Sequence, residues 1–150
     1  ETAAIGPDDV VLEVGTGSGF MAALMSHRAM HVHTLETNAA LVQRARDTLR
    51  QQGVFNVTVL EVSAEQVAQG LAAEGPFDAI VLSGSVAEVP RSLLQQLKPG
   101  GRLVAVVGQE PIMCARLWRR TGEAAWEASD LFDTVAPRLQ GFAEPSRFRP

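Results

Sequence analysis

Three glycines and two carboxylates near the start of the chain have types and spacings that could bind a ligand. Gly15, Gly17 and Gly19 end the apolar stretch "VVLEVGTGSGF" at every second position. Glycine lets the backbone turn sharply and lets a ligand approach closely, because no Cβ stands in the way. Glu13 lies just before these glycines, and Glu36 follows some twenty positions later. The pattern predicts a backbone cradle with an acid on each side.

Two strands and a helix would position these residues. The apolar run Val10–Val14 predicts a buried strand, 18–29 an amphipathic helix, and the alternating segment His31–Glu36 a second strand. Unpaired amides at the start of that helix would favour an anionic group of the ligand. An acid at the end of the second strand is a suitable acceptor for the two hydroxyls of a ribose.

The rest of the chain continues the alternation of helix and strand. Asn38 predicts a helix start and Gly53 follows its end. We expect further helices at 38–52, 64–73 and 90–97, further strands at 57–62, 78–83 and 102–107, and a final pair of strands at 112–119 and 124–132. This order predicts an α/β fold, Rossmann-like and doubly wound, with a mostly parallel sheet of about seven strands and an antiparallel C-terminal hairpin at one edge. Residues 1–135 would form the core and 136–150 an irregular tail.

Composition excludes several classes of protein. The chain has 150 residues, 46% of them apolar and 20% charged, which suits one globular domain. It has no apolar run long enough for a membrane helix, and a net charge of −4 does not favour nucleic acid. One cysteine, Cys114, suits a reducing compartment, so we expect a cytoplasmic protein. Because the chain starts at Glu1 and not at Met, we interpret it as a piece of a longer protein or as a trimmed chain.

The glycine spacing alone does not separate a dinucleotide from S-adenosylmethionine (SAM). The dinucleotide fingerprint is G-x-G-x-x-G/A, with glycine or alanine at its last position. If the fingerprint starts at Gly15, that position is Phe20 and the sequence does not match; if it starts at Gly17, that position is Ala22 and the sequence matches. Glu13 favours SAM, because a carboxylate would repel a pyrophosphate but attract the ammonium group of a methionine. A nicotinamide-dependent oxidoreductase is the weaker alternative.

Several motifs together resemble class I SAM-dependent methyltransferases, and most closely the protein-L-isoaspartate O-methyltransferase family. The resemblance runs from Asp9 to Phe132 and rests on "VLEVGTGSG", "VHTLE", "FDAIVLSGS", "LLQQLKPGGRLVAVVG" and "LFDT". It implies a methyltransferase that takes SAM, releases S-adenosylhomocysteine, and methylates a carboxylate of a protein (isoaspartyl-like) or of a related small molecule.

The resemblance also implies a set of cofactor-binding residues. The methionine part of SAM would contact Glu13, Gly15, Thr16, Gly17, Ser18 and Gly19. The ribose would contact Glu36, with Thr37 beside it, and the adenine would contact Ser63 and Ala64. Ser83 and Gly84 would face the reacting methyl group. The family usually has an aspartate at the position of Ser63, so adenine binding is expected to be weaker or rearranged. No catalytic residue is assigned, because a carboxylate acceptor is already a nucleophile at neutral pH.

The family's substrate loop precedes the glycine strand and has no counterpart in this chain. The chain by itself is therefore expected to expose its cofactor cleft and can lack activity. A SAM-binding module without catalysis of its own is the alternative, and the oligomeric state is not predicted.

The other polar side chains have plainer explanations. His27, His31 and His33 span a helix end, a turn and a strand, so no metal site is expected. The arginines of the hairpin predict a solvated sheet edge, and Trp118 and Trp126 predict a cross-strand pair.

Overall fold

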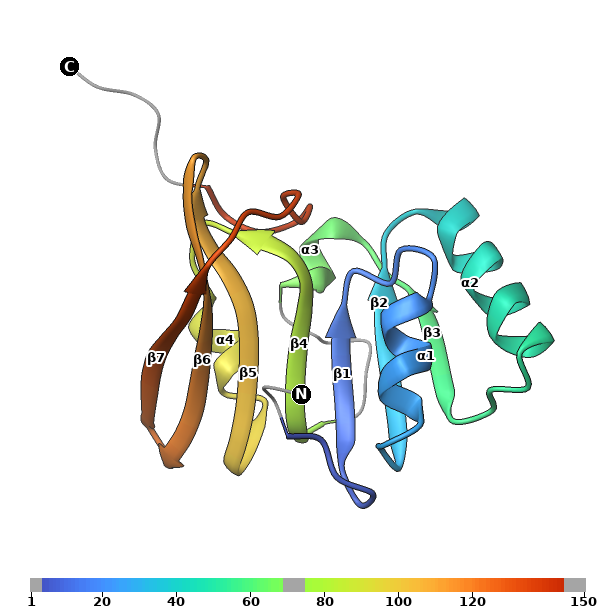
Figure 1. Cartoon of the computed structure of the whole chain (residues 1–150), viewed down its shortest axis with the longest axis horizontal. Helices are drawn as coiled ribbons and strands as arrows, with labels where there is room; N and C mark the ends of the chain where they lie inside the picture. The colour runs from blue at the N-terminus through green and yellow to red at the C-terminus, as the bar shows by residue number, and fades with distance from the viewer. Residues whose placement is uncertain (1–3, 69–74, 145–150) are drawn as a thin grey trace.

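A computed structural model describes residues 4–68 and 75–144 and shows one sheet with helices on both faces (Figure 1). Its strands are β1 Val10–Val14, β2 His31–Glu36, β3 Val57–Glu61, β4 Phe77–Val86, β5 Leu97–Gln109, β6 Ile112–Gly122 and β7 Ala125–Asp133. Among the described residues these seven strands lie in the order β3-β2-β1-β4-β5-β6-β7. The first five are parallel, β6 is antiparallel to β5, and β7 is antiparallel to β6. The predicted fold class is confirmed.

The helices are shorter than predicted. They are α1 Phe20–Ser26, α2 Ala39–Gln51, α3 Ala64–Val67 and α4 Arg91–Leu94. Gly19 is the N-cap of α1 with φ of 88°, so that helix begins after the glycine loop and not at Ser18. The predicted end of the helix at 64–73 lies outside the described residues. No helix in the described part of the chain is long and apolar enough to cross a membrane.

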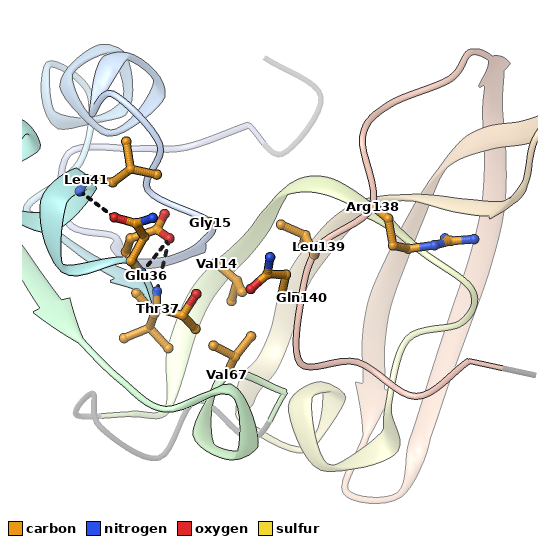
Figure 2. A pocket seen from close by; sticks show the side chains of 11 residues that line it. Val14, Gly15, Glu36, Thr37, Leu41, Val67, Arg138, Leu139 and Gln140 are labelled. Carbon is orange, nitrogen blue, oxygen red and sulfur yellow. Dashed lines mark hydrogen bonds between the residues drawn. The ribbon is translucent and has the colours of Figure 1, made fainter.

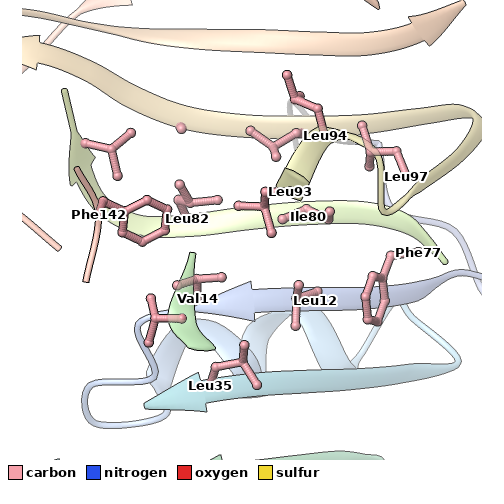
Figure 3. Packing of buried hydrophobic residues seen from close by; sticks show 14 of the residues in the cluster. Leu12, Val14, Leu35, Phe77, Ile80, Leu82, Leu93, Leu94, Leu97 and Phe142 are labelled. Atoms are coloured by element: carbon pink, nitrogen blue, oxygen red, sulfur yellow. The ribbon is translucent and has the colours of Figure 1, made fainter. Parts of the chain in front are cut away.

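The alternation of side chains along β1 divides the core between the two faces of the sheet. Val11 faces the side covered by α1 and α2, where it packs with Ala22 and Met25. Leu12 and Val14 face the opposite side, which holds the larger core (Figure 3). That core includes Leu35, Phe77, Ile80, Leu93, Leu97 and Phe142. Both faces of β1 are therefore buried, as its continuous apolar run predicts.

The hairpin forms the solvated edge of the sheet, with β7 as its outer strand, but one end of the hairpin is held against α4. Arg120, predicted to be solvated, donates to the carbonyl oxygens of Leu97 (2.6 Å) and Gln95 (3.1 Å). The indole N–H of Trp126 donates to the carbonyl oxygen of Leu94 at 3.1 Å. Trp126 pairs in register with Arg120, and Trp118 with Ala128, so the two tryptophans are not directly opposite. Arginine and indole donors thus fix the hairpin to the end of α4.

Residues 136–144, called the arm below, return over the end of β4 without forming a regular element (Figure 1). The amide of Ser85 donates to the carbonyl of Pro137 (2.7 Å), and the amide of Leu139 donates to the carbonyl of Ser85 (2.8 Å). Phe142 is buried in the larger core. The described part of the predicted tail contains no helix or strand, and these contacts fix it on the sheet.

Candidate functional site

A pocket of about 220 Å³ opens at the carboxyl ends of β1 and β2 (Figure 2). The chain builds the sheet outward in one direction through β2 and β3 and then crosses to β4 on the other side of β1. Doubly wound folds bind their ligands at such a switch point. The pocket is lined by Val14, Gly15, Leu35, Glu36, Thr37, Asn38, Leu41, Val67, Arg138, Leu139 and Gln140.

The glycine loop needs its glycines, but it uses most of its own amides. Gly15, Gly17 and Gly19 have φ of 95°, 55° and 88°, which side chains with a Cβ rarely adopt. The amides of Gly15 and Thr16 donate to the carbonyl of Leu35 at 2.9 and 3.2 Å, and the amide of Gly19 donates to the carbonyl of Thr16. The loop is therefore fixed from within, and it offers a ligand fewer amides than the sequence suggests.

Glu36 organises the rim of the pocket. One carboxylate oxygen accepts from the amide of Gly17 at 3.0 Å, and the other accepts from the amides of Thr37 (3.0 Å) and Asn38 (3.1 Å). The Asn38 side chain caps α2 through the amide of Leu41, as predicted. Glu36 thus ties the glycine loop to the start of α2, and its carboxylate lies at the edge of the pocket.

Glu13 is buried beneath the loop and does not line the pocket. Its carboxylate accepts from the hydroxyls of Thr34 (2.7 Å) and Ser83 (2.5 Å). Burial raises the pKa of Glu13 from 4.5 to about 7; the hydrogen bonds from Ser83 and Thr34 oppose this shift, and the charge of Glu36 adds to it. Because Thr34 donates to Glu13, the Thr16 hydroxyl donates to Thr34 at 2.7 Å. Of this group only Ser83 is exposed.

Leu139 of the arm covers the first glycine. A Cβ added to Gly15 would lie 2.8 Å from Leu139 Cδ2, and one added to Gly84 would lie 2.7 Å from the same atom. These two glycines leave room for the leucine. The cleft, expected to be exposed, is partly covered by the arm at this point, above the predicted site of the methionine group.

Ser63 is the N-cap of α3 and Ala64 is its first residue; both lie where the chain passes from β3 to α3, outside the pocket lining. The Ser63 hydroxyl accepts from the amide of Gln66, and the Gln66 side chain accepts from the amide of Ser63, which makes a capping box. The arm touches this turn, because Gly141 packs against the Ala64 carbonyl with no room for a Cβ. Ser18 is exposed on the glycine loop.

Sequence reasoning missed the far wall of the pocket. Arg138, Leu139 and Gln140 come from the arm, which has no periodicity, and Val67 comes from α3. Leu41 belongs to α2, a helix that the sequence predicts, so only its place in the pocket was missed. Nothing in the spacing of the arm residues indicates that they return to the glycine loop.

Two larger pockets are weaker candidates for a ligand site. One of about 520 Å³ lies between the segment after β4 and the hairpin, and one of about 440 Å³ lies along α2 and β3. Neither contains a glycine loop or a carboxylate at the switch point. Within residues 4–68 and 75–144, no three His, Cys, Asp or Glu side chains form a group that could bind a metal.

Sequence comparison finds one family model that matches residues 1–135: protein-L-isoaspartate(D-aspartate) O-methyltransferase. The protein-L-isoaspartate O-methyltransferase of Azorhizobium caulinodans is 38% identical over 95% of this chain, and that of a Jannaschia species is 42% identical over 91%. The chain spans 65% and 61% of these two relatives.

Solved structures share the fold. A protein-L-isoaspartate O-methyltransferase superposes with a TM-score of 0.80 at 22% identity, over 92% of this chain and 44% of its own. A putative member from Plasmodium falciparum, solved with S-adenosyl-L-homocysteine, gives a TM-score of 0.75 at 21% identity, over 91% of this chain and 67% of its own.

Proposed function

This chain belongs to the protein-L-isoaspartate(D-aspartate) O-methyltransferase family, and from that membership we propose that the whole protein methylates isoaspartyl carboxylates of proteins with SAM as donor. The observation that carries the proposal is the carboxylate of Glu36 at the rim of the switch-point pocket, tied to the glycine loop. A carboxylate in that place suits a ribose diol. The two alternatives, a module without catalysis and a nicotinamide oxidoreductase, are not supported by the family match.

The residues of the pocket fit the nucleoside half of SAM. Val14, Leu41 and Val67 give apolar walls for a base, and Glu36 with Thr37 gives polar groups for a ribose. The methionine half would extend over Gly15 towards Ser83, where Leu139 now lies. We propose that Leu139 shifts when this half binds.

The main role of this chain in methyl transfer is to position the two reactants. When bound, SAM supplies a methyl group activated by a sulfonium. In the transfer, a carboxylate oxygen of the acceptor forms a new bond to the methyl carbon while the carbon–sulfur bond breaks. The electron pair of the broken bond stays on sulfur. No proton moves, so positioning and exclusion of water dominate the rate enhancement.

We further propose that Glu13 acts through Ser83. The Ser83 hydroxyl donates its hydrogen bond to Glu13, so only its lone pairs are left for a ligand, and we propose that they accept from the methionine ammonium. An oxygen that cannot donate accepts from an ammonium and disfavours a carboxylate. Glu13 would therefore be a positioning residue, with Thr34 and Thr16 holding its other side.

The reaction can be tested with two matched peptides. The protein is incubated with SAM carrying a labelled methyl group and with a peptide containing either isoaspartate or ordinary aspartate. We expect base-labile label only in the isoaspartyl peptide. Equal labelling of both peptides, or of neither, would contradict the proposed acceptor.

We propose that this reaction takes place in the cytoplasm, because a sequence with a single cysteine suits a reducing compartment.

A further inference from the structure

The base end of the pocket lacks the polar side chains that the sequence suggested for it. Ser63 is engaged in the capping box of α3, Ala64 has no polar side chain, and Val67 is apolar. A purine base has donors and acceptors on its edge, and a site that leaves them unpaired loses affinity. Another element must supply the contact.

The arm brings one suitable side chain to this end. Gln140 lines the pocket opposite Glu36 and Thr37, and Figure 2 shows its carboxamide on the pocket side of the arm, beside Val14. Arg138 points away in the same view, towards its ion pair with Glu144. Within the described parts of the chain the Gln140 carboxamide has no hydrogen-bond partner, so it is available to a ligand.

The backbone of Gln140 is fixed although its side chain is exposed. On one side, Leu139 is bonded to Ser85. On the other, Gly141 packs against the carbonyl of Ala64 and Phe142 is buried in the core. The arm therefore presents Gln140 at a set distance from the β3–α3 turn, and only the side chain needs to order on binding.

We propose that Gln140 recognises the edge of the adenine base, in place of an acidic residue after β3. A carboxamide carries both a donor and an acceptor, so it can pair at once with the exocyclic amino group and the adjacent ring nitrogen of adenine. The pairing buries no net charge. This inference rests on the proposed function, because it assumes an adenosine ligand in the pocket.

The test compares two ligands in three proteins. S-adenosylhomocysteine and its analogue lacking the 6-amino group are titrated calorimetrically into the wild type, Gln140→Met and Gln51→Met. Methionine keeps the length of the side chain and removes the amide, and Gln51 is an exposed glutamine at the end of α2. We expect Gln140→Met to weaken the binding of S-adenosylhomocysteine roughly 5- to 20-fold, because one or two neutral hydrogen bonds are lost. It should weaken the binding of the analogue by a smaller factor, because the analogue keeps the ring nitrogen but has no amino group to lose. Gln51→Met should match the wild type for both ligands.

Two results would overturn the inference in distinguishable ways. If the wild type binds S-adenosylhomocysteine and Gln140→Met binds it equally well, Gln140 does not contact the base, and the proposed function stands. If the wild type binds neither ligand, the inference and the proposed function fall together.

Discussion

At the scale of single residues, the two carboxylates beside the glycine loop have different tasks. Glu36 lies at the pocket rim and accepts three backbone amides, whereas Glu13 is buried and accepts two hydroxyls. The sequence predicted both as ligands. The alternation of side chains along a strand could have indicated the burial of Glu13, because it shares its face of β1 with Val11.

The buried carboxyl of Glu13 should make stability depend on pH. Its pKa is raised from 4.5 to about 7, so between these values the folded protein keeps a proton that the unfolded chain has lost. The free energy of unfolding should therefore fall as pH rises through this window, by on the order of 3 kcal/mol. Glu13→Gln should remove most of this decrease, and urea unfolding at pH 5 and pH 8 measures it. Glu61→Gln, at an exposed strand end, serves as control, and equal pH slopes for wild type and Glu13→Gln would contradict the account.

Glu36→Ala should weaken the binding of an adenosine ligand by ~1–3 kcal/mol, because two charge-assisted hydrogen bonds to the ribose are lost. Isothermal titration with S-adenosylhomocysteine measures the change. Glu61 pairs with Glu36 in register on the neighbouring strand, so Glu61→Ala is a matched control and should bind normally. Unchanged affinity in Glu36→Ala would mean that Glu36 does not hold the ribose.

At the scale of elements, the regular ones were predictable and the arm was not. Apolar runs and alternation locate β1 to β5, because burial on one or both faces of a sheet imposes those patterns. Asn38 and Gly53 mark the ends of α2 through capping chemistry. The arm is positioned by contacts of Leu139, Gly141 and Phe142 with distant segments, and such contacts leave no local pattern.

The arm should depend on its anchor in the core. Phe142→Ala removes a buried ring and leaves a cavity, so we expect a loss of about 3–5 kcal/mol in the free energy of unfolding. Chemical denaturation measures this loss. Phe55→Ala changes a ring that is 85% exposed and should cost under about 0.5 kcal/mol. Equal, small effects of the two substitutions would mean that the arm is not anchored.

Gly84 should be coupled to Leu139. A Cβ at residue 84 meets the Leu139 side chain, so Gly84→Ala alone should destabilise the protein by about 1–3 kcal/mol. Combining it with Leu139→Ala should recover part of that loss, which a double-mutant cycle followed by thermal unfolding would detect. If the losses in unfolding free energy from the two substitutions simply add, the Cβ introduced at residue 84 and Leu139 have no unfavourable steric contact. Gly122→Ala, whose Cβ would have ordinary contacts, is the control.

At the scale of the whole molecule, the methyltransferase fold builds a pocket from two walls that come from opposite ends of the sequence. The amino-terminal half supplies the glycine loop and Glu36, and the arm supplies Leu139 and Gln140. We propose that this pocket takes the nucleoside of SAM and not a dinucleotide.

Calorimetric titration of the chain with S-adenosylhomocysteine and, separately, with NAD tests that claim most directly. We predict saturable binding of S-adenosylhomocysteine with one site per chain, and no binding of NAD at the same concentrations. Binding of NAD without binding of S-adenosylhomocysteine would contradict the account.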